Sequence, residues 1–294
     1  MEDIEEAKQA VFEEEYFLTP AECNPQGRMP ITLLINRLIE VATLHANQLG
    51  IGFASLVDRH ETWVLSRVAV EMGRYPRWNE RYRIATWVNS INRLFSERDF
   101  EILDGEGRVI GHARTVWAVM NTDTRQVADI SHMEWVREFI PERECPVAKP
   151  GRLRPLTVFE SHPYRFTYCD MDFNRHVNSS RYIELLLNQW DLAFHDCHRL
   201  TRFEIAYVRE AVYGEEVEVR ICPAGGSAGA GGSSAYASPQ SASPQSASPQ
   251  AAVGAGEPPR EETYLAELAH DGEGLCRALL RFRETEGYVP RVGG

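Results

Sequence analysis

The sequence of 294 residues contains no run of about 18 consecutive apolar residues, the length at which a membrane-spanning helix would be expected. Its acidic start, MEDIEEAKQA, lacks the apolar core of a secretory signal and the Arg- and Ser-rich character of a transit peptide. We therefore expect a cytoplasmic protein that has no membrane partner.

The cysteines form no pattern that would hold a metal. The sequence has no CxxC pair and no cluster of cysteine and histidine at zinc-binding spacing. We therefore expect reduced and mostly buried thiols, with no metal and no other cofactor. The cysteines stand singly, at Cys23, Cys145, Cys169, Cys197, Cys222 and Cys276.

An excess of basic charge is also absent. The formal net charge of −12 argues against a nucleic-acid partner, because phosphate binding requires basic surface. An acidic protein partner would need a local basic patch, for which ordinary solvated surface is the alternative interpretation. The candidate residues are Arg152, Arg154, Arg165, Arg175 and Arg181.

An internal repeat organises the chain. Residues 16–40 align without gaps with the residues from 164 onward, and each segment has a strand-like start, a turn-rich middle and an amphipathic tail. Apolar residues recur at helical spacing in both tails, which predicts one helix with an apolar face in each half. The periodic positions are Leu34, Leu38, Val41, His45 and Leu49 in the first tail, and Tyr182, Leu185, Leu186, Trp190 and Ala193 in the second.

Four segments rich in β-branched and aromatic residues follow each predicted helix and indicate strands. The sequence DGEG separates the last two strands of each half, at residues 104–107 and 271–274, and Asp-Gly is a strong hairpin signal. One long helix followed by an antiparallel sheet, twice over, predicts an α+β chain. We expect two tandem hot-dog domains, in each of which the sheet wraps around the helix.

The repeat also predicts the domain boundaries. We expect an N-terminal hot-dog domain at residues 1–140, a linker rich in proline and charge at 141–156, and a C-terminal domain at 157–294. The second domain contains an insertion at about residues 224–260, rich in Gly, Ser, Pro and Gln, whose composition cannot form a core. We predict a disordered loop at a hairpin tip.

Residues 169–184, CDMDFNRHVNSSRYIE, carry the candidate chemistry. Asp172, Asn174 and His176 are two residues apart, so in an extended segment their side chains would project to one side. Residues 178–180 are of capping types, which would place the free N–H groups of a helix start beside them. An acid, an amide and an imidazole at a position that favours negative charge suit attack on a carbonyl.

The same segment has plainer interpretations. Asp172 and Asn174 could form only a polar turn, with His176 a satisfied turn or core histidine. A calcium loop is excluded, because Arg175 occupies the required glycine position and Arg181 the position of the bidentate glutamate.

The first half provides an internal comparison. Its residues that match the three candidates are Asn24, Gln26 and Arg28, so this copy has neither the acid nor the imidazole. We therefore expect the first half to be non-catalytic and free to shape a substrate pocket, with Leu34 and Leu38 as lining candidates unless they belong to the plain core.

Together these motifs resemble the acyl-ACP thioesterases of the plant and bacterial fatty-acid type. The family motif DxNxHVN is matched by residues 172–178 and followed by Tyr182, and the first half is matched by TWVLSRVAVEMGRYPRW and TVWAVMNTDTRQVADI. A further family acid, on a second-half strand, corresponds to Glu210. Plant members have a cysteine at the next position, where this chain has Ala211, so a cysteine nucleophile is excluded. The resemblance assigns no role to Cys169, which we expect to be a packed small residue.

The resemblance implies direct hydrolysis of fatty acyl-ACP, which releases free fatty acid and terminates chain elongation. Glu210 or Asp172 would activate a water, Asn174 would orient the water or the substrate, and His176 would polarise the thioester or protonate the leaving sulfur. The implied partner is acyl carrier protein with its acyl-phosphopantetheine, and a homodimer is possible. An acyl-CoA thioesterase and a non-catalytic hot-dog protein that binds acyl thioesters remain the alternative functions.

Overall fold

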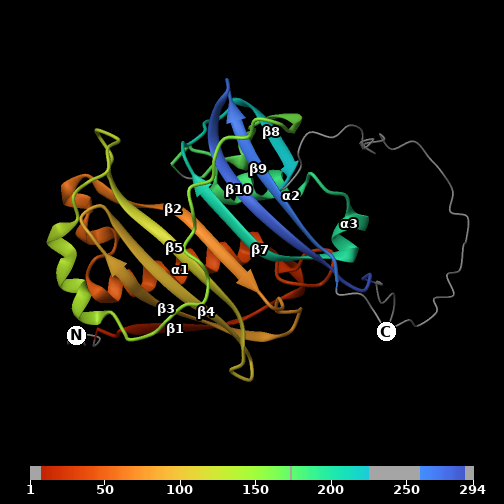
Figure 1. Ribbon diagram of the computed structural model, residues 1–294. Helices are drawn as coiled ribbons and strands as arrows, with labels where there is room; N and C mark the ends of the chain where they lie inside the picture. The colour runs from red at the N-terminus through yellow and green to blue at the C-terminus, as the bar shows by residue number, and fades with distance from the viewer. Residues whose placement is uncertain (1–7, 173, 225–258, 289–294) are drawn as a thin grey trace, which may run out of the picture.

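The computed structural model describes residues 8–172, 174–224 and 259–288 (Figure 1). In the first half, strand β1 (Val11–Phe17) and helix α1 (Ile31–Leu49) precede strands β2 (Glu61–Met72), β3 (Arg81–Ile91), β4 (Phe95–Asp104) and β5 (Val109–Asn121). In the second half, strand β6 (Glu160–Arg165) and helices α2 (Ser179–Leu187) and α3 (Leu192–Cys197) precede strands β7 (His198–Tyr207), β8 (Glu216–Pro223), β9 (Glu261–His270) and β10 (Glu273–Glu284).

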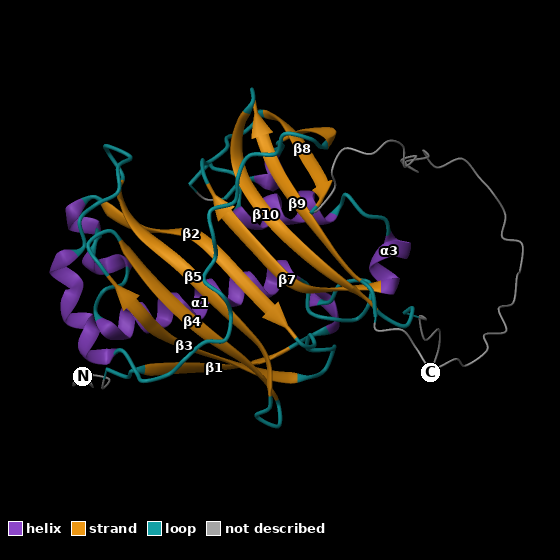
Figure 2. Cartoon of the chain, viewed as in Figure 1, coloured by secondary structure: helices purple, strands orange, loops and turns teal. Residues whose placement is uncertain are grey.

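The strands form one antiparallel sheet of ten strands in the order β1-β3-β4-β5-β2-β7-β10-β9-β8-β6. The second half repeats the order of the first in reverse, so the halves meet where β2 pairs with β7. Each half therefore contributes five strands, and the curved sheet wraps around the helices (Figure 2). This arrangement confirms the predicted tandem hot-dog architecture.

Helix α1 lies in the concave face of the first half (Figure 2). All five predicted apolar-face residues, from Leu34 to Leu49, are buried, because helical spacing aligns them on one side. The helix ends at Gly50, whose left-handed φ of 81° suits a residue without Cβ.

The second helix is shorter than predicted. Helix α2 ends at Leu187, and the chain resumes helical structure only at α3. The carboxylate of Asp191 accepts a hydrogen bond from the N–H of Phe194 at 2.8 Å and so caps a new helix instead of continuing the first. As a result Trp190 lies between the two helices, where its ring packs edge-on against Phe282 at 5.0 Å.

Residues 140–159 contain no strand or α-helix and cross the outer face of the sheet (Figure 1). The N–H of Leu156, for example, donates to the Glu267 carboxylate at 3.4 Å. The predicted domain boundaries stay a prediction, and the predicted insertion at about 224–260 lies almost entirely outside the described residues.

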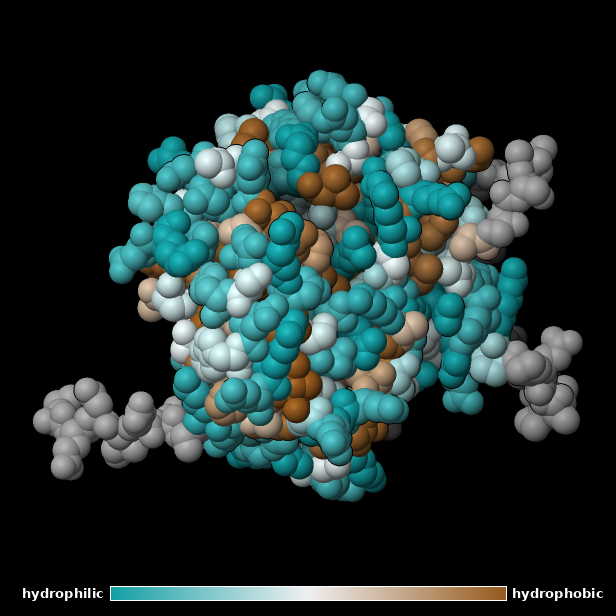
Figure 3. All heavy atoms as spheres, turned by 60° about the vertical axis from the view of Figure 1, so that its left-hand side comes forward, coloured by the Kyte–Doolittle hydropathy of each residue, from teal (hydrophilic) through white to brown (hydrophobic). Residues whose placement is uncertain are grey.

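The two DGEG turns join β4 to β5 and β9 to β10, as predicted. None of the described helices is long and apolar enough to cross a membrane. The face shown in Figure 3 is mostly hydrophilic, with hydrophobic atoms in small separate patches.

Candidate active site

The loop between η5 (Tyr168–Asp170) and α2 is held by the side chain of its second residue, Asp172. Asp172 Oδ1 accepts hydrogen bonds from the backbone N–H groups of Asn174 at 2.8 Å and His176 at 3.0 Å. The N–H of Asp172 in turn donates to the His176 carbonyl at 2.8 Å. Such Asx turns stabilise a tight reversal of the chain without regular secondary structure.

This geometry corrects the expectation of an extended segment. Arg175 adopts a left-handed φ of 65°, and Met171 forms a β-bridge with Val177, so the intervening chain is a turn. The physical reason is the Asp172 carboxylate, which offers the backbone a local acceptor that competes with strand pairing. Asp172 is thus committed to shaping the loop.

The turn presents His176 to Glu210. Nε2 of His176 lies 3.6 Å from Oε2 of Glu210, and both side chains are partly exposed, at 32% and 41%. Glu210 does not lie on a strand, because β7 ends at Tyr207. It lies in the following loop, where the β-bridge between His176 and Val212 holds the two loops together.

The first half also reaches this site. The guanidinium of Arg125, from the turn after β5, forms an ion pair with the Glu210 carboxylate across 85 positions in sequence. The turn that carries Arg125 is fixed by Asn121 Oδ1, which accepts hydrogen bonds from the N–H groups of Asp123 and Thr124. Sequence reasoning missed Arg125, although it lies in the stretch TVWAVMNTDTRQVADI that carries part of the family resemblance.

The start of α2 adjoins the loop as predicted. The Asn178 side chain accepts a hydrogen bond from the N–H of Ser180 at 3.0 Å and caps the helix. One turn later, the buried Tyr182 hydroxyl accepts a hydrogen bond from the Ala211 N–H at 2.9 Å. This bond ties α2 to the residue after Glu210, so helix, loop and acid form one unit.

The remaining candidates are more solvent-accessible. Asn174 is exposed, and within the described chain its side-chain amide makes no hydrogen bond. Of the predicted basic patch, Arg181 pairs with Glu184 at the start of α2. Arg152 and Arg154 instead line a separate hollow of about 450 Å³ together with Arg277 of β10. Arg152 and Arg154 therefore have different neighbours from Arg181.

The first-half loop at residues 24–28 has the same backbone as the loop at 172–176. Asn24 Oδ1 accepts a hydrogen bond from the Arg28 N–H at 3.0 Å, as Asp172 does from His176. Gly27 has the same φ of 65° as Arg175, and Arg28 forms a β-bridge with Arg77 as His176 does with Val212.

The two halves also correspond at the position of Glu210. The N–H of Met29 donates to the carbonyl of Pro76, and the N–H of Val177 donates to the carbonyl of Ala211, both at 2.9 Å. Pro76 therefore matches Ala211, which places Tyr75 at the position of Glu210. The first half has the scaffold without the histidine and the acid.

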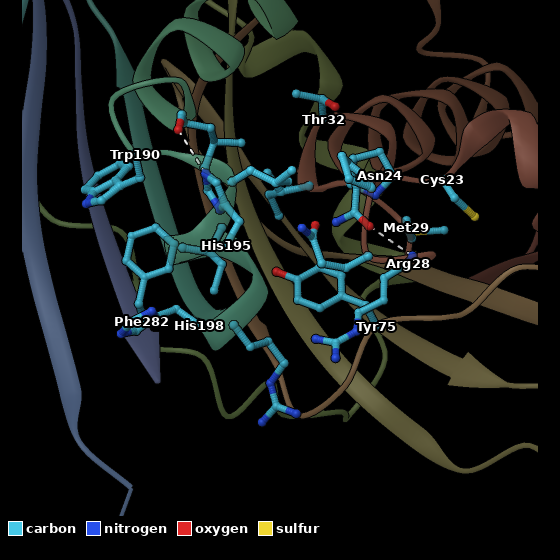
Figure 4. Close-up of a pocket in the computed structure, with 18 of the residues that line it drawn as sticks. Cys23, Asn24, Arg28, Met29, Thr32, Tyr75, Trp190, His195, His198 and Phe282 are labelled. Atoms are coloured by element: carbon cyan, nitrogen blue, oxygen red, sulfur yellow. Dashed lines mark hydrogen bonds between the residues drawn. The ribbon is translucent and has the colours of Figure 1, made fainter. Parts of the chain in front are cut away.

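A cavity of about 550 Å³ opens at this first-half loop, between α1, α2 and the start of β7 (Figure 4). All four first-half counterparts line it, whereas His176 and Glu210 do not: the four are Asn24, Gln26, Arg28 and Tyr75. Leu34 and Leu38 belong to the main core and are absent from its lining.

The thiols are less buried than expected. Cys169 and Cys197 are exposed, and only Cys276 is fully buried. Cys169 is not a packed small residue, because it lies in the short 3₁₀ turn η5 on the surface. Burial raises the pKa of the Cys276 thiol to about 12, which makes it a poor nucleophile at neutral pH. The described residues contain no group of three or more His, Cys, Asp or Glu that could hold a metal ion.

Comparison with known proteins identifies the family of both halves. Residues 9–138 match the acyl-ACP thioesterase N-terminal domain, and residues 153–237 match the C-terminal domain of the same family. A crystal structure of an acyl-ACP thioesterase from Bacteroides thetaiotaomicron superposes with a TM-score of 0.75 and 29% identity, covering 93% of this chain and 98% of that one.

Plant relatives are similar over most of this chain. The chain is 26% identical over 237 residues to a chloroplastic dodecanoyl-[acyl-carrier-protein] hydrolase of Cinnamomum camphora, which covers 75% of this chain. It is 28% identical over 219 residues to the chloroplastic oleoyl-acyl carrier protein thioesterase 2 of Arabidopsis thaliana, which covers 68% of this chain. The chain spans only 62% and 59% of the lengths of these two relatives. Because both domains of one family match in order along it, the chain belongs to the acyl-ACP thioesterase family.

Proposed function

We propose that this protein hydrolyses the thioester of a fatty acyl chain carried on acyl carrier protein. Family membership supports the substrate class. One contact supports hydrolysis above all: the 3.6 Å approach of His176 Nε2 to Glu210 Oε2 beside the start of α2. An imidazole and a carboxylate at this distance can share the proton transfers of an acyl-transfer reaction through one water.

In the proposed reaction, Glu210 removes a proton from a water whose oxygen forms a bond to the thioester carbon. The carbonyl oxygen takes up negative charge, which the N-terminal end of α2 stabilises. The C–S bond then breaks, and His176 supplies the proton that the leaving sulfur needs. The products are the free fatty acid and the thiol of the carrier, and the acyl chain can no longer be elongated.

Glu210 is the proposed base because Asp172 has another task. Asp172 Oδ1 already accepts two backbone hydrogen bonds and maintains the loop. The exposed amide of Asn174 is available to orient the water or the substrate. Arg125 pairs with Glu210 and would fix the direction of its carboxylate.

We propose acyl carrier protein with its acyl-phosphopantetheine as the partner, and the second half as the catalytic one. A cytoplasmic location and a homodimer stay predictions. The acidic carrier would meet the arginines nearest the site. These are Arg125, which pairs with Glu210, and Arg175, which directly precedes His176, and both are exposed.

The test compares carriers for one acyl chain. Purified protein is given the same chain on acyl carrier protein and on CoA, for several chain lengths, and free fatty acid is measured. We expect a kcat/KM at least about tenfold higher on acyl carrier protein, because only the protein carrier can contact the surface around the site. Equal or higher values on CoA would favour an acyl-CoA thioesterase, and no release from either would favour a binding protein.

A further inference from the structure

The cavity at the first-half loop has an unusual charge balance. Arg28 and Arg199 both line it, and within the described residues neither guanidinium has an ion-pair partner. Nε of Arg199 is buried without a hydrogen-bond partner. Burial, together with the nearby guanidiniums of Arg77 and Arg199, lowers the pKa of Arg28. Two crowded and uncompensated cations favour an anion between them.

The acids near the cavity do not compensate these cations. Glu184 lines the cavity but is paired with Arg181. Asp196 accepts a hydrogen bond from Gln26 Nε2 at 2.8 Å, keeps its negative charge, and forms no ion pair with Arg28 or Arg199 among the described residues. His195 is bound to the carbonyl of Leu187 through Nε2 at 3.1 Å. Neither Arg28 nor Arg199, both of which line the cavity, is therefore neutralised by a direct ion pair with these acids.

The opposite wall is mainly aromatic. Figure 4 shows Trp190, His195, His198 and Phe282 on one side of the cavity, facing Tyr75 and Arg28 on the other. One ring nitrogen of each histidine is bound to a backbone carbonyl, that of Leu187 for His195 and that of Phe194 for His198. Trp190 and Phe282 pack edge-on at 5.0 Å and are backed by Phe194, which lies 5.1 Å from Phe282. The volume of about 550 Å³ falls in the usual range for small-molecule sites, of about 300 to 1,000 Å³.

We infer that this cavity is a second ligand site that binds a free fatty acid, with its carboxylate between Arg28 and Arg199 and its hydrocarbon chain along the wall of Trp190 and Phe282. A head that carries one negative charge and a tail without polar atoms match the two walls. The phenol of Tyr75 lines the cavity beside the arginines and can donate to the carboxylate.

The repeat explains how such a site can exist. The first-half loop keeps the fold of the catalytic loop but places Arg28 where the second half has His176, and Tyr75 where it has Glu210. These replacements remove the groups proposed to hydrolyse a thioester and supply groups that bind a carboxylate. This inference goes beyond the proposed function, because binding at this site requires no turnover.

Trp190 provides a local signal for the test. The full chain, without acyl carrier protein, is titrated with a fatty acid brominated on its chain, and tryptophan fluorescence is recorded, since bromine quenches an indole that it contacts. We expect saturable quenching that is lost in Trp190→Phe. We expect the dissociation constant to rise at least about tenfold in Arg28→Gln and in Arg199→Gln, as loss of a charged hydrogen bond predicts.

Further variants separate charge from folding. Arg28→Lys keeps the cation and should recover part of the affinity. Arg93→Gln removes an exposed arginine that pairs with Asp129 and should leave the dissociation constant unchanged. Thermal melting checks that each variant is folded.

Several results would overturn the inference. These are equal affinity for the brominated alcohol of the same length, unchanged affinity in both arginine variants, or quenching that persists in Trp190→Phe. Displacement of the fatty acid by inorganic phosphate at similar concentration would show a small-anion site instead. Because no thioester is present, no turnover occurs during the titration. The proposed catalytic site releases the same kind of fatty acid, so only the quenching that is lost in Trp190→Phe is assigned to this cavity.

Discussion

The loop at residues 24–28 and the loop at residues 172–176 have the same backbone and different chemistry. Each is closed by an Asn or Asp side chain that accepts the N–H four residues later, at 3.0 Å in both copies. Each has one left-handed residue, Gly27 in the first and Arg175 in the second. The scaffold therefore does not require the catalytic residues.

This comparison separates residues that build the loop from residues that act in it. Asn24 and Asp172 occupy the same structural position, and both accept backbone hydrogen bonds. Arg28 and His176 share a position but differ in charge, size and acid–base chemistry. The side chains at the positions of Arg28 and His176, and not the backbone of the loop, therefore determine what each half can do.

The largest effect should come from His176 and Glu210. We expect His176→Ala and Glu210→Ala each to lower kcat on acyl-ACP by about 10²-fold or more, since general acid–base catalysis contributes about 10²- to 10⁴-fold. The measurement is steady-state release of free fatty acid. Cys169→Ala is the control and should retain wild-type turnover, because this thiol is exposed and lies in η5, outside the loops that carry His176 and Glu210. Wild-type turnover in both alanine variants would refute the proposed site.

The next prediction is the pH dependence of stability that His45, a histidine of the first half without a counterpart in the second, should cause. His45 is fully buried, its Nε2 donates to the Gln9 carbonyl at 2.8 Å, and its Nδ1 accepts from Arg98 at 2.6 Å. Burial and the positive charge of Arg98 lower the pKa of His45 from 6.5 to about 4. The second half has no matching position in α2, which ends at Leu187.

The sign of the pH dependence follows from that lowered pKa. Between pH 6.5 and about 4 the unfolded chain binds a proton at His45 that the folded chain does not, so acidification favours unfolding. We expect the free energy of unfolding to fall by up to about 3 kcal/mol across this window, since each pH unit is worth about 1.4 kcal/mol. Urea unfolding at several pH values measures it. His45→Gln should flatten the curve in this window, and an equally steep curve would contradict the assignment.

The comparison also provides a test of which acid is the base. Because Asn24 holds the first-half loop, Asp172→Asn should hold the second-half loop and keep activity within about tenfold of wild type. Asp172→Ala should lose more than that, because the two backbone N–H groups lose their acceptor, at a cost of about 1–3 kcal/mol. Initial rates on acyl-ACP measure both. If Asp172→Asn is as inactive as Glu210→Ala, Asp172 is the base.

Much of the fold could be predicted from local sequence pattern. The face of α1 from Leu34 to Leu49 and the two DGEG turns are set by residues close together in the chain. The end of α2 was not predicted, because the pattern through Trp190 and Ala193 continues the helical spacing. The helix is interrupted because Asp191 caps a new helix, and this cap depends on a single hydrogen bond that the apolar spacing does not reveal.

The site could be predicted only where its residues lie close together in the sequence. Asp172 and His176 belong to one short motif, and the structure places them in one turn. Arg125 lies 85 positions from Glu210, and contacts between the two halves, among them the pairing of β2 with β7, bring the two residues together. The cavity at Arg28 likewise depends on α2, α3 and β7, which local patterns near residue 28 do not contain.

The smallest effect should come from the bond that joins α2 to the loop of Glu210. The Tyr182 hydroxyl accepts the hydrogen bond of the buried Ala211 N–H at 2.9 Å. We expect Tyr182→Phe to lower the free energy of unfolding by about 1–3 kcal/mol, because this N–H is left buried without a partner. Urea denaturation measures the change, and an unchanged midpoint would show that water replaces the hydroxyl.

The first half indicates how to reverse that loss. There the positions of Tyr182 and Ala211 are occupied by Leu34 and Pro76, and proline has no N–H that needs an acceptor. We therefore expect Ala211→Pro to restore stability in the Tyr182→Phe background and to cost stability, or leave it unchanged, when Tyr182 is present. If the proline fails to rescue, the lost stability comes from packing of the hydroxyl and not from the unpaired N–H. In that case Pro76 of the first half would not be a substitute for the hydrogen bond between Tyr182 and Ala211, although the two loops have the same backbone.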